Sequence, residues 1–110
     1  MNTFLGGSIR KSLLRQFLND AHALICKGWC KGTSSKDYFG EPCLVQSEKA
    51  RFFCLEGALL AAAGPHYRVV RDYLVQFLPP SFDFLSDFND VQIGKQPILE
   101  LIEKGLESLE

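Results

Sequence analysis

The most apolar segment of the chain lies between residues 47 and 65 and reads SEKARFFCLEGALLAAAGP. From residue 52 to residue 63 the hydrophobic and small side chains are interrupted by charge only at Glu56. Ser47 is suited to cap the start of a helix, and Gly64-Pro65 is suited to end it. A helix this apolar is buried on most of its sides. The pattern therefore predicts one central core helix over residues 47–65.

Other segments carry apolar residues at the spacing of an amphipathic helix. Ser8 is a candidate N-cap for the first of them, Gly28 is a stop signal at its end, and Pro79-Pro80 ends the second. A shorter aromatic segment, residues 81–88, is predicted to form one or two helical turns or a packed loop. The predicted amphipathic helices cover residues 8–27, 65–78 and 97–109.

The longest irregular stretch, residues 28–46, has the sequence GWCKGTSSKDYFGEPCLVQ. Its glycines and proline break any helix, and residues 42–45 are predicted to be a short extended segment. Four large apolar side chains are expected to anchor this loop on the helices: Trp29, Tyr38, Phe39 and Leu44.

No alternating strand pattern of useful length is present, so the pattern predicts an all-α fold. We expect a compact single domain, residues 1–110, of four to five helices with one long structured loop. Residues 1–7 are expected to be a poorly ordered arm.

Composition agrees with a globular domain, with 46% hydrophobic and 23% charged residues. The net charge is −1, but residues 1–51 carry an excess of Lys and Arg, and residues 52–110 carry an excess of Asp and Glu. We interpret this asymmetry as two complementary surfaces within one fold. Neither a secretory leader nor an apolar run long enough to span a membrane is recognisable, so a cytoplasmic location is expected.

Four cysteines and two histidines raise the question of a metal or catalytic site. His22, Cys26 and Cys30 are spaced four residues apart, which suits shared ligation on one helix face. However, no CxxC pair exists, and Gly28 is expected to end the helix before Cys30. We expect reduced thiols that are mostly buried, and no metal or cofactor. A structural zinc, a disulfide and cysteine catalysis stay open as alternatives.

Acidic and aromatic residues alternate between residues 82 and 90. Paired carboxylates could bind a cation or transfer a proton, but Asn and Asp more often hold turns by bonding to backbone amides. We expect Asn89 and Asp90 to hold a defined turn that passes through Gly94. Trp29 is the only tryptophan, and we expect it to be a packing anchor.

Several segments together resemble a family of small bacterial and phage proteins catalogued as a domain of unknown function. They are Trp29-Cys30-Lys31-Gly32, the stretch ARFFCLEGAL at residues 50–59, Phe88-Asn89-Asp90 and the closing helix. The family shows a tryptophan-led loop, a WC-x-x-GAL-like helix and a WND-like turn, and the resemblance covers residues 12–109. Phe53 and Phe88 stand where the family commonly has tryptophan. The resemblance implies no activity.

Three functions follow as hypotheses. The first is a non-enzymatic module that binds a protein partner or itself through the long loop or residues 82–88. The second is a small enzyme or ligand binder with a pocket between the Trp29 loop and the Asn89-Asp90 turn. The third, which composition disfavours, is a nucleic-acid-binding regulator that uses Arg10, Lys11 and Arg15. The candidate binding residues are Trp29, Tyr38, Phe82, Phe84, Asp87, Asn89 and Asp90.

Overall fold

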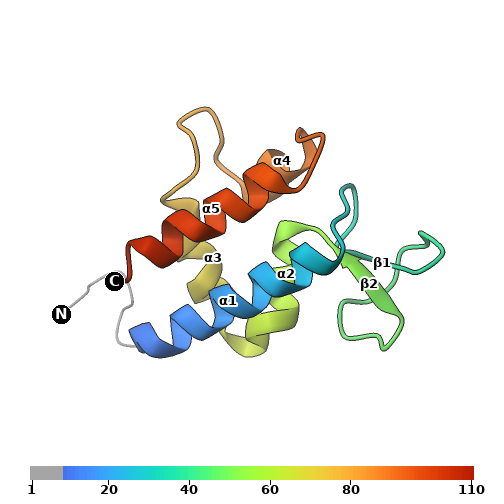
Figure 1. Ribbon diagram of the computed structural model, residues 1–110, viewed down its shortest axis with the longest axis horizontal. Helices are drawn as coiled ribbons and strands as arrows, with labels where there is room; N and C mark the ends of the chain where they lie inside the picture. Colours follow the sequence, from blue (N-terminus) through green and yellow to red (C-terminus); the bar gives the residue numbers. More distant parts are fainter. Residues whose placement is uncertain (1–8) are drawn as a thin grey trace.

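The computed structural model describes residues 9–110 (Figure 1). The arm predicted over residues 1–7 and the Ser8 cap lie outside the described residues. A β-hairpin lies at one end of the helical body, away from the C-terminus. In chain order the elements are α1 (Lys11–Lys27), β1 (Ser35–Asp37), β2 (Ala50–Phe53), α2 (Leu55–Ala63), the 3-10 turn η2 (Gly64–His66), α3 (Tyr67–Val75), α4 (Leu85–Asp90) and α5 (Gln96–Glu107).

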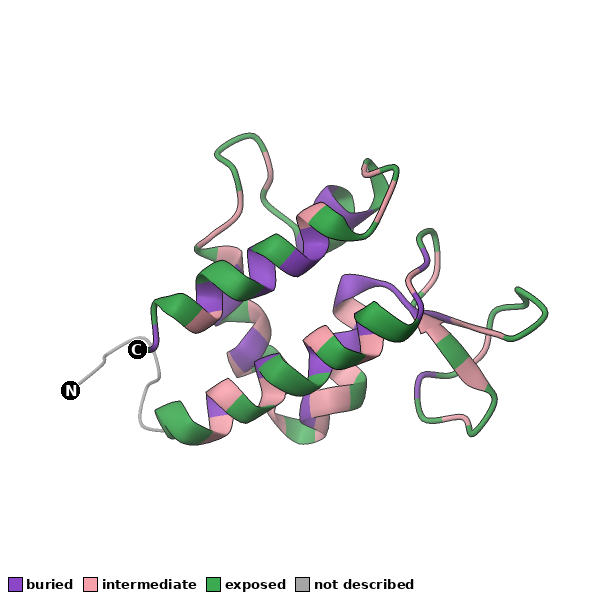
Figure 2. Cartoon of the chain, viewed as in Figure 1, coloured by how far each residue is buried: buried purple, intermediate pink, exposed green. Residues whose placement is uncertain are grey.

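The helices pack around one core, and their buried positions face inward (Figure 2). Along α1, the buried residues are Leu14, Leu18, Ala21 and Ile25, which recur at intervals of three or four and so form one stripe. Helix α1 packs against both α2 and α5. The amphipathic prediction for α1 is confirmed, and Gly28 ends the helix as expected.

The all-α prediction is wrong, because β1 and β2 form a two-stranded antiparallel sheet and the fold is mixed α/β. Phe53 lies opposite Ser35, and Phe52 lies opposite Lys36. On its other side, Phe53 exchanges backbone hydrogen bonds with Gly28 and Cys30. Residues 50–53 therefore pair with β1, and Phe53 also has backbone partners on its other side. This pairing stabilises an extended conformation at a place where the side-chain pattern favours a helix.

The predicted core helix is consequently shorter than expected. Helix α2 begins after Cys54, which replaces Ser47 as the cap, because its thiol accepts a hydrogen bond from the Gly57 amide at 3.2 Å. The helix itself is buried as predicted, and Leu55, Ala58 and Leu59 are inaccessible to solvent. Gly64, with φ of 53°, ends it in a conformation that favours glycine.

The other predicted boundaries shift by a few residues. Pro65 lies in the 3-10 turn rather than at the start of α3, and α3 ends at Val75. Asn89 and Asp90 close helix α4 rather than beginning a turn. Of the four predicted loop anchors, only Trp29 packs against the core. Tyr38, Phe39 and Leu44 are 76%, 83% and 76% exposed, so that part of the anchoring prediction is wrong.

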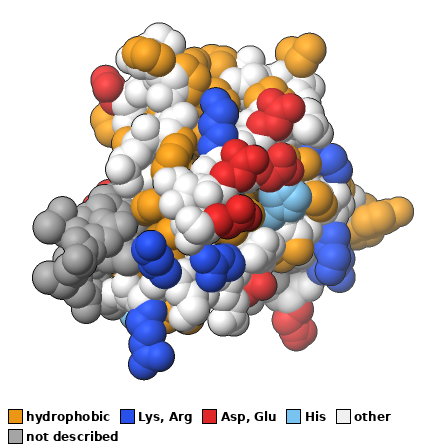
Figure 3. Space-filling model, turned by 60° about the vertical axis from the view of Figure 1, so that its left-hand side comes forward, with side chains coloured by type: hydrophobic (Ala, Val, Ile, Leu, Met, Phe, Trp, Pro, Cys, Tyr) orange, Lys and Arg blue, Asp and Glu red, His pale blue; other side chains and the backbone are white. Residues whose placement is uncertain are grey.

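Charge is mixed over the visible surface rather than gathered into one large patch of a single sign (Figure 3). Among residues 9–110, Arg71 forms an ion pair with Asp72, and His22 lies within ion-pair distance of Glu103, an ion pair only when the imidazole is protonated. No helix in this described part of the chain has both the length and the apolar character that a membrane crossing requires.

Candidate functional site

Asn89 connects three segments that lie far apart in the sequence. Its side chain is fully buried. The Oδ1 atom accepts hydrogen bonds from Trp29 Nε1 at 2.8 Å and from the Leu55 amide at 3.1 Å. The Nδ2 group donates to the Cys30 carbonyl at 3.2 Å and to Asp90 Oδ1 at 3.0 Å. One side chain thus fixes the Trp29 loop and the start of α2 against α4.

The neighbouring residues extend this connection. Asp90 Oδ1 also accepts a hydrogen bond from the Gly32 amide at 3.2 Å. Lys31 Nζ donates to the Gln92 carbonyl at 2.6 Å and lies over the Trp29 ring. Every buried side-chain nitrogen and oxygen within residues 9–110 has a partner in the protein. The polar atoms of the Asn89 side chain therefore stabilise the fold by bonding to other segments of the domain.

The remaining candidate residues are not gathered around Asn89. Phe82 packs edge-to-face on Phe88 at 5.4 Å, whereas Phe84 and Asp87 are exposed. A hollow of about 200 Å³ beside Asp90 is lined by residues of the 32–34 loop, by α4 and by the start of α2, but not by Trp29 or Asn89. The structure thus brings together Trp29, Asn89 and Asp90, and it leaves Tyr38 and Phe84 exposed to solvent.

All four cysteines are free thiols. Cys30 and Cys54 are buried, Cys43 is half-buried and Cys26 is exposed. Burial raises the pKa of Cys54, and burial together with the neighbouring Cys54 raises the pKa of Cys30 to about 11. Within residues 9–110, no group of three or more His, Cys, Asp or Glu side chains has the geometry to hold a metal ion.

The raised pKa of Cys30 predicts a loss of stability in alkali. In the unfolded chain this thiol loses its proton near pH 9, but in the folded protein it does so only near pH 11. The unfolded state therefore binds fewer protons between these values, and the free energy of unfolding should fall as the pH rises from 9 toward 11. One group contributes at most about 1.4 kcal/mol per pH unit.

Urea unfolding at pH 8 and at pH 10 measures this effect. The Cys30→Ala variant should lose less stability between the two pH values than the natural chain. Equal losses in both proteins would contradict the assignment to Cys30. Cys54 shifts in the same direction, so some loss should persist in the variant.

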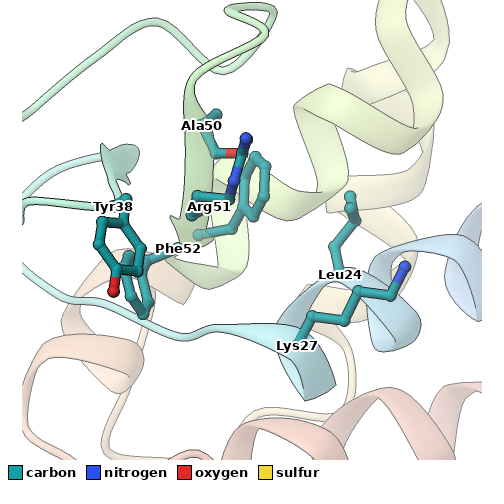
Figure 4. A pocket seen from close by; sticks show the side chains of 7 residues that line it. Leu24, Lys27, Tyr38, Ala50, Arg51 and Phe52 are labelled. Carbon is teal, nitrogen blue, oxygen red and sulfur yellow. The ribbon is translucent and has the colours of Figure 1, made fainter.

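A second group of residues forms an open surface on the β-hairpin. We define the hairpin surface as Tyr38, Phe39, Leu44, Lys49, Arg51 and Phe52. A hollow of about 460 Å³ is lined by β2 and by the C-terminal end of α1 (Figure 4). Leu24 and Lys27 line it from α1, and Tyr38 and residues of β2 line it from the hairpin. An adjoining hollow of about 270 Å³ shares Tyr38 and Arg51 with the first.

The backbone of the hairpin is held in place by its own hydrogen bonds. Asp37 Oδ1 accepts from the amides of Phe39 and Glu41, both at 2.9 Å. Gly40 adopts a φ of 85°, which glycine tolerates without strain. Ser35 Oγ donates to the Cys43 carbonyl at 2.6 Å and ties the outer segment to β1. Tyr38 and Phe39 are therefore presented from a fixed turn, with their ring centroids 5.4 Å apart.

The cations on this surface have no carboxylate within ion-pair distance among residues 9–110. Arg51 instead donates to the carbonyls of Glu48 and Ala50, which hold its guanidinium against the backbone. Lys27 and Lys49 line the two hollows. The hairpin surface thus offers exposed aromatic area beside positive charge that pairs with no carboxylate of residues 9–110.

Sequence reasoning named Tyr38 as a candidate but missed the rest of this surface. Phe39 and Leu44 were expected to be anchors, and Lys49 and Arg51 were assigned to the core helix. One local signal was present, because Asp37 and Gly40 stand at the first and last positions favoured in a type I turn. That signal predicts a turn with Tyr38 and Phe39 at its tip.

Comparison with known proteins gives a family but no characterised relative. The model of a family described as "Family of unknown function (DUF6197)" matches residues 10–105. No curated protein and no solved structure matches the chain. This agrees with the resemblance to a domain of unknown function, and it supplies no activity.

Proposed function

The chain belongs to the DUF6197 family, whose function is unknown. We propose that it is a non-enzymatic module that binds a protein partner through the hairpin surface. One observation carries the proposal. Tyr38 and Phe39 are 76% and 83% exposed although they stand side by side on a fixed turn. Contiguous apolar area on the surface of a protein often marks a site of interaction with a partner.

The order of the hairpin favours tight binding. Aromatic side chains and arginine dominate the energy of most protein interfaces. Ordering a loop on association costs free energy. The hydrogen bonds of Asp37 and Ser35 already order this loop in the free protein, so binding does not carry that cost. A partner would gain the apolar area of Tyr38 and Phe39 at little conformational cost.

The charges indicate what kind of segment fits. Lys27, Lys49 and Arg51 border the hollows, and no carboxylate of the described residues pairs with them. Asp37 also lines the second hollow, but its Oδ1 accepts two backbone amides of the turn. We therefore propose an acidic protein segment with at least one apolar side chain, which would enter the hollow between α1 and β2. The charges would speed association and make it sensitive to salt.

The double variant Tyr38→Ser/Phe39→Ser is expected to lose partner binding while it keeps the fold. Truncating a central aromatic residue of an interface commonly costs 2 kcal/mol or more, so the Kd should rise by about 30-fold or more. The partner is first captured from host lysate on the natural chain, and its Kd is then measured by biolayer interferometry at two salt concentrations.

Ile93→Ser is the matched control, because Ile93 is fully exposed and lies outside the hairpin surface. The proposal is supported by a protein that the natural chain and the control bind equally and the double variant does not. Sedimentation of the chain alone reveals self-association, which would make a second copy the partner. If no protein shows this selective loss, the hairpin surface is not an interface.

The nucleic-acid hypothesis has less support from the geometry. Arg15 donates to the Leu109 carbonyl at 2.9 Å and so is used within the fold. Fluorescence anisotropy with a single-stranded oligonucleotide tests it directly. Binding that disappears in the Tyr38→Ser/Phe39→Ser variant would reassign the hairpin surface to nucleic acid.

A further inference from the structure

A thiol, an imidazole and a carboxylate meet on the surface between α1 and α5. Cys26 Sγ lies 3.6 Å from His22 Nδ1, one helical turn away on α1. His22 Nε2 lies 2.8 Å from Glu103 Oε2 on α5. When the ring hydrogen is on Nε2, that group donates to the carboxylate, and Nδ1 is left to accept the thiol proton. The three side chains thus form a Cys-His-Glu sequence of contacts.

The thiol in this group can be reached from solvent. Cys26 is exposed, whereas Cys30 and Cys54 are buried. The His22 side chain is 26% exposed and that of Glu103 is 50% exposed. Lys95 Nζ donates to the Cys26 carbonyl at 2.7 Å, which brings a positive charge to the same place. A nucleophile beside a base that a third group orients is the arrangement by which proteins activate thiols.

We propose that Cys26 is a site of reversible modification by low-molecular-weight disulfides. His22 takes the proton of the Cys26 thiol, and the thiolate attacks one sulfur of the small disulfide. The new bond joins Cys26 Sγ to that sulfur, the original S–S bond breaks, and the departing thiolate takes the proton from His22. One disulfide is consumed and one is formed, so no further oxidant or reductant is needed. Glu103 acts as a positioning residue that stabilises the imidazolium.

The open surface around Cys26 favours exchange with a small disulfide over catalysis on a large substrate. Neither Cys26 nor His22 lines any of the hollows described above, so a bulky substrate would find no walls to bind. A small disulfide needs only access to the sulfur. Lys95 favours reagents that carry negative charge, such as glutathione disulfide. This inference is independent of the proposed partner binding.

Site-resolved mass spectrometry of the folded chain with glutathione disulfide tests the proposal. Cys26 should react about tenfold or more faster than Cys43, which is half-buried and lies 3.7 Å from Ser35 Oγ without a nearby imidazole. His22→Gln should lower the Cys26 rate about tenfold and leave the Cys43 rate unchanged. Glu103→Ala should lower it less, and Glu103→Gln, which keeps an acceptor oxygen, should restore part of the loss.

His66→Gln is the matched control, because it removes the other histidine, which stacks on Phe17 away from any thiol. Circular dichroism checks that each variant is folded. The neutral reagent 2-hydroxyethyl disulfide isolates the charge of Lys95, since Lys95→Gln should slow only the reaction with glutathione disulfide. Equal rates at Cys26 and Cys43 in the natural chain would overturn the proposal, and so would an unchanged Cys26 rate in His22→Gln.

Discussion

Replacement of Asn89 by alanine is expected to lower the free energy of unfolding by about 3 kcal/mol or more. The change removes the acceptor for Trp29 Nε1 and the Leu55 amide and the donor to the Cys30 carbonyl. Leaving a buried donor or acceptor without a partner costs about 1–3 kcal/mol for each group. Urea unfolding followed by the fluorescence of the single tryptophan, Trp29, measures both the stability and the loosened contact.

The matched control is Asp87→Ala on the same helix, because Asp87 is exposed. It should change the stability by no more than about 0.5 kcal/mol. A double-mutant cycle with Trp29→Phe isolates the bond between the two side chains, and we expect a coupling of about 1 kcal/mol. Its four proteins are compared by urea unfolding followed by circular dichroism, because the Trp29→Phe variants lack the tryptophan. A Trp29 emission that stays the same in Asn89→Ala would mean that this hydrogen bond does not hold the loop.

The helices that pack through one amphipathic face were predictable from the sequence. The stripe from Leu14 to Ile25 repeats over several turns, and the buried positions of α5 continue from Ile98 to Gly105. Such a pattern reports on the burial of side chains within one segment. It therefore identifies a helix without any knowledge of the residues that pack against it.

The hairpin was not predictable in this way, because its stability lies in backbone pairing between distant residues. Residues 50–53 alternate only weakly in burial over four positions, which is too short a run for a period of two to be recognised. Their partners are the amides and carbonyls of residues 28–37, and backbone groups leave no trace in the side-chain pattern. Because the apolar residues of β2 run directly into those of α2, the side-chain pattern favoured one longer helix.

The candidate site residues were likewise predictable only where the signal lies within one segment of the sequence. Asn89 was predicted to hold a local turn, but its side chain instead joins α4 to Trp29 and to the Leu55 amide. The polar, structural use of the side chain agrees with the prediction, whereas its distant partners could not be named from the sequence. Tyr38 was identified by its aromatic character alone. Its exposure follows from the Asp37–Gly40 turn, which carries it away from the core. Aromatic residues in loops are anchors more often than not, so sequence alone favoured the wrong environment.

Gly57→Ala is expected to lower the free energy of unfolding by about 3 kcal/mol, at the upper end of the usual cost of overpacking. A Cβ at this position would stand 2.0 Å from the Ser34 carbonyl oxygen. That carbonyl accepts the hydrogen bond of the Cys54 amide, so it can retreat only by breaking the contact that joins the hairpin to α2. Alanine stabilises a helix by about 1 kcal/mol relative to glycine. The steric cost is larger, so the net change in the free energy of unfolding is a loss.

Gly94→Ala provides the comparison, since a Cβ there would have no neighbour within 4 Å and the residue does not have a positive φ. This variant should be neutral or slightly more stable, because alanine restricts the unfolded chain. Urea unfolding by circular dichroism ranks the three proteins. If Gly57→Ala proved as stable as Gly94→Ala, the close approach of the Ser34 backbone to α2 would be wrong. The helix and the hairpin would then not be in close contact at this point, and Tyr38 and Phe39 would be held only by the hydrogen bonds within the hairpin.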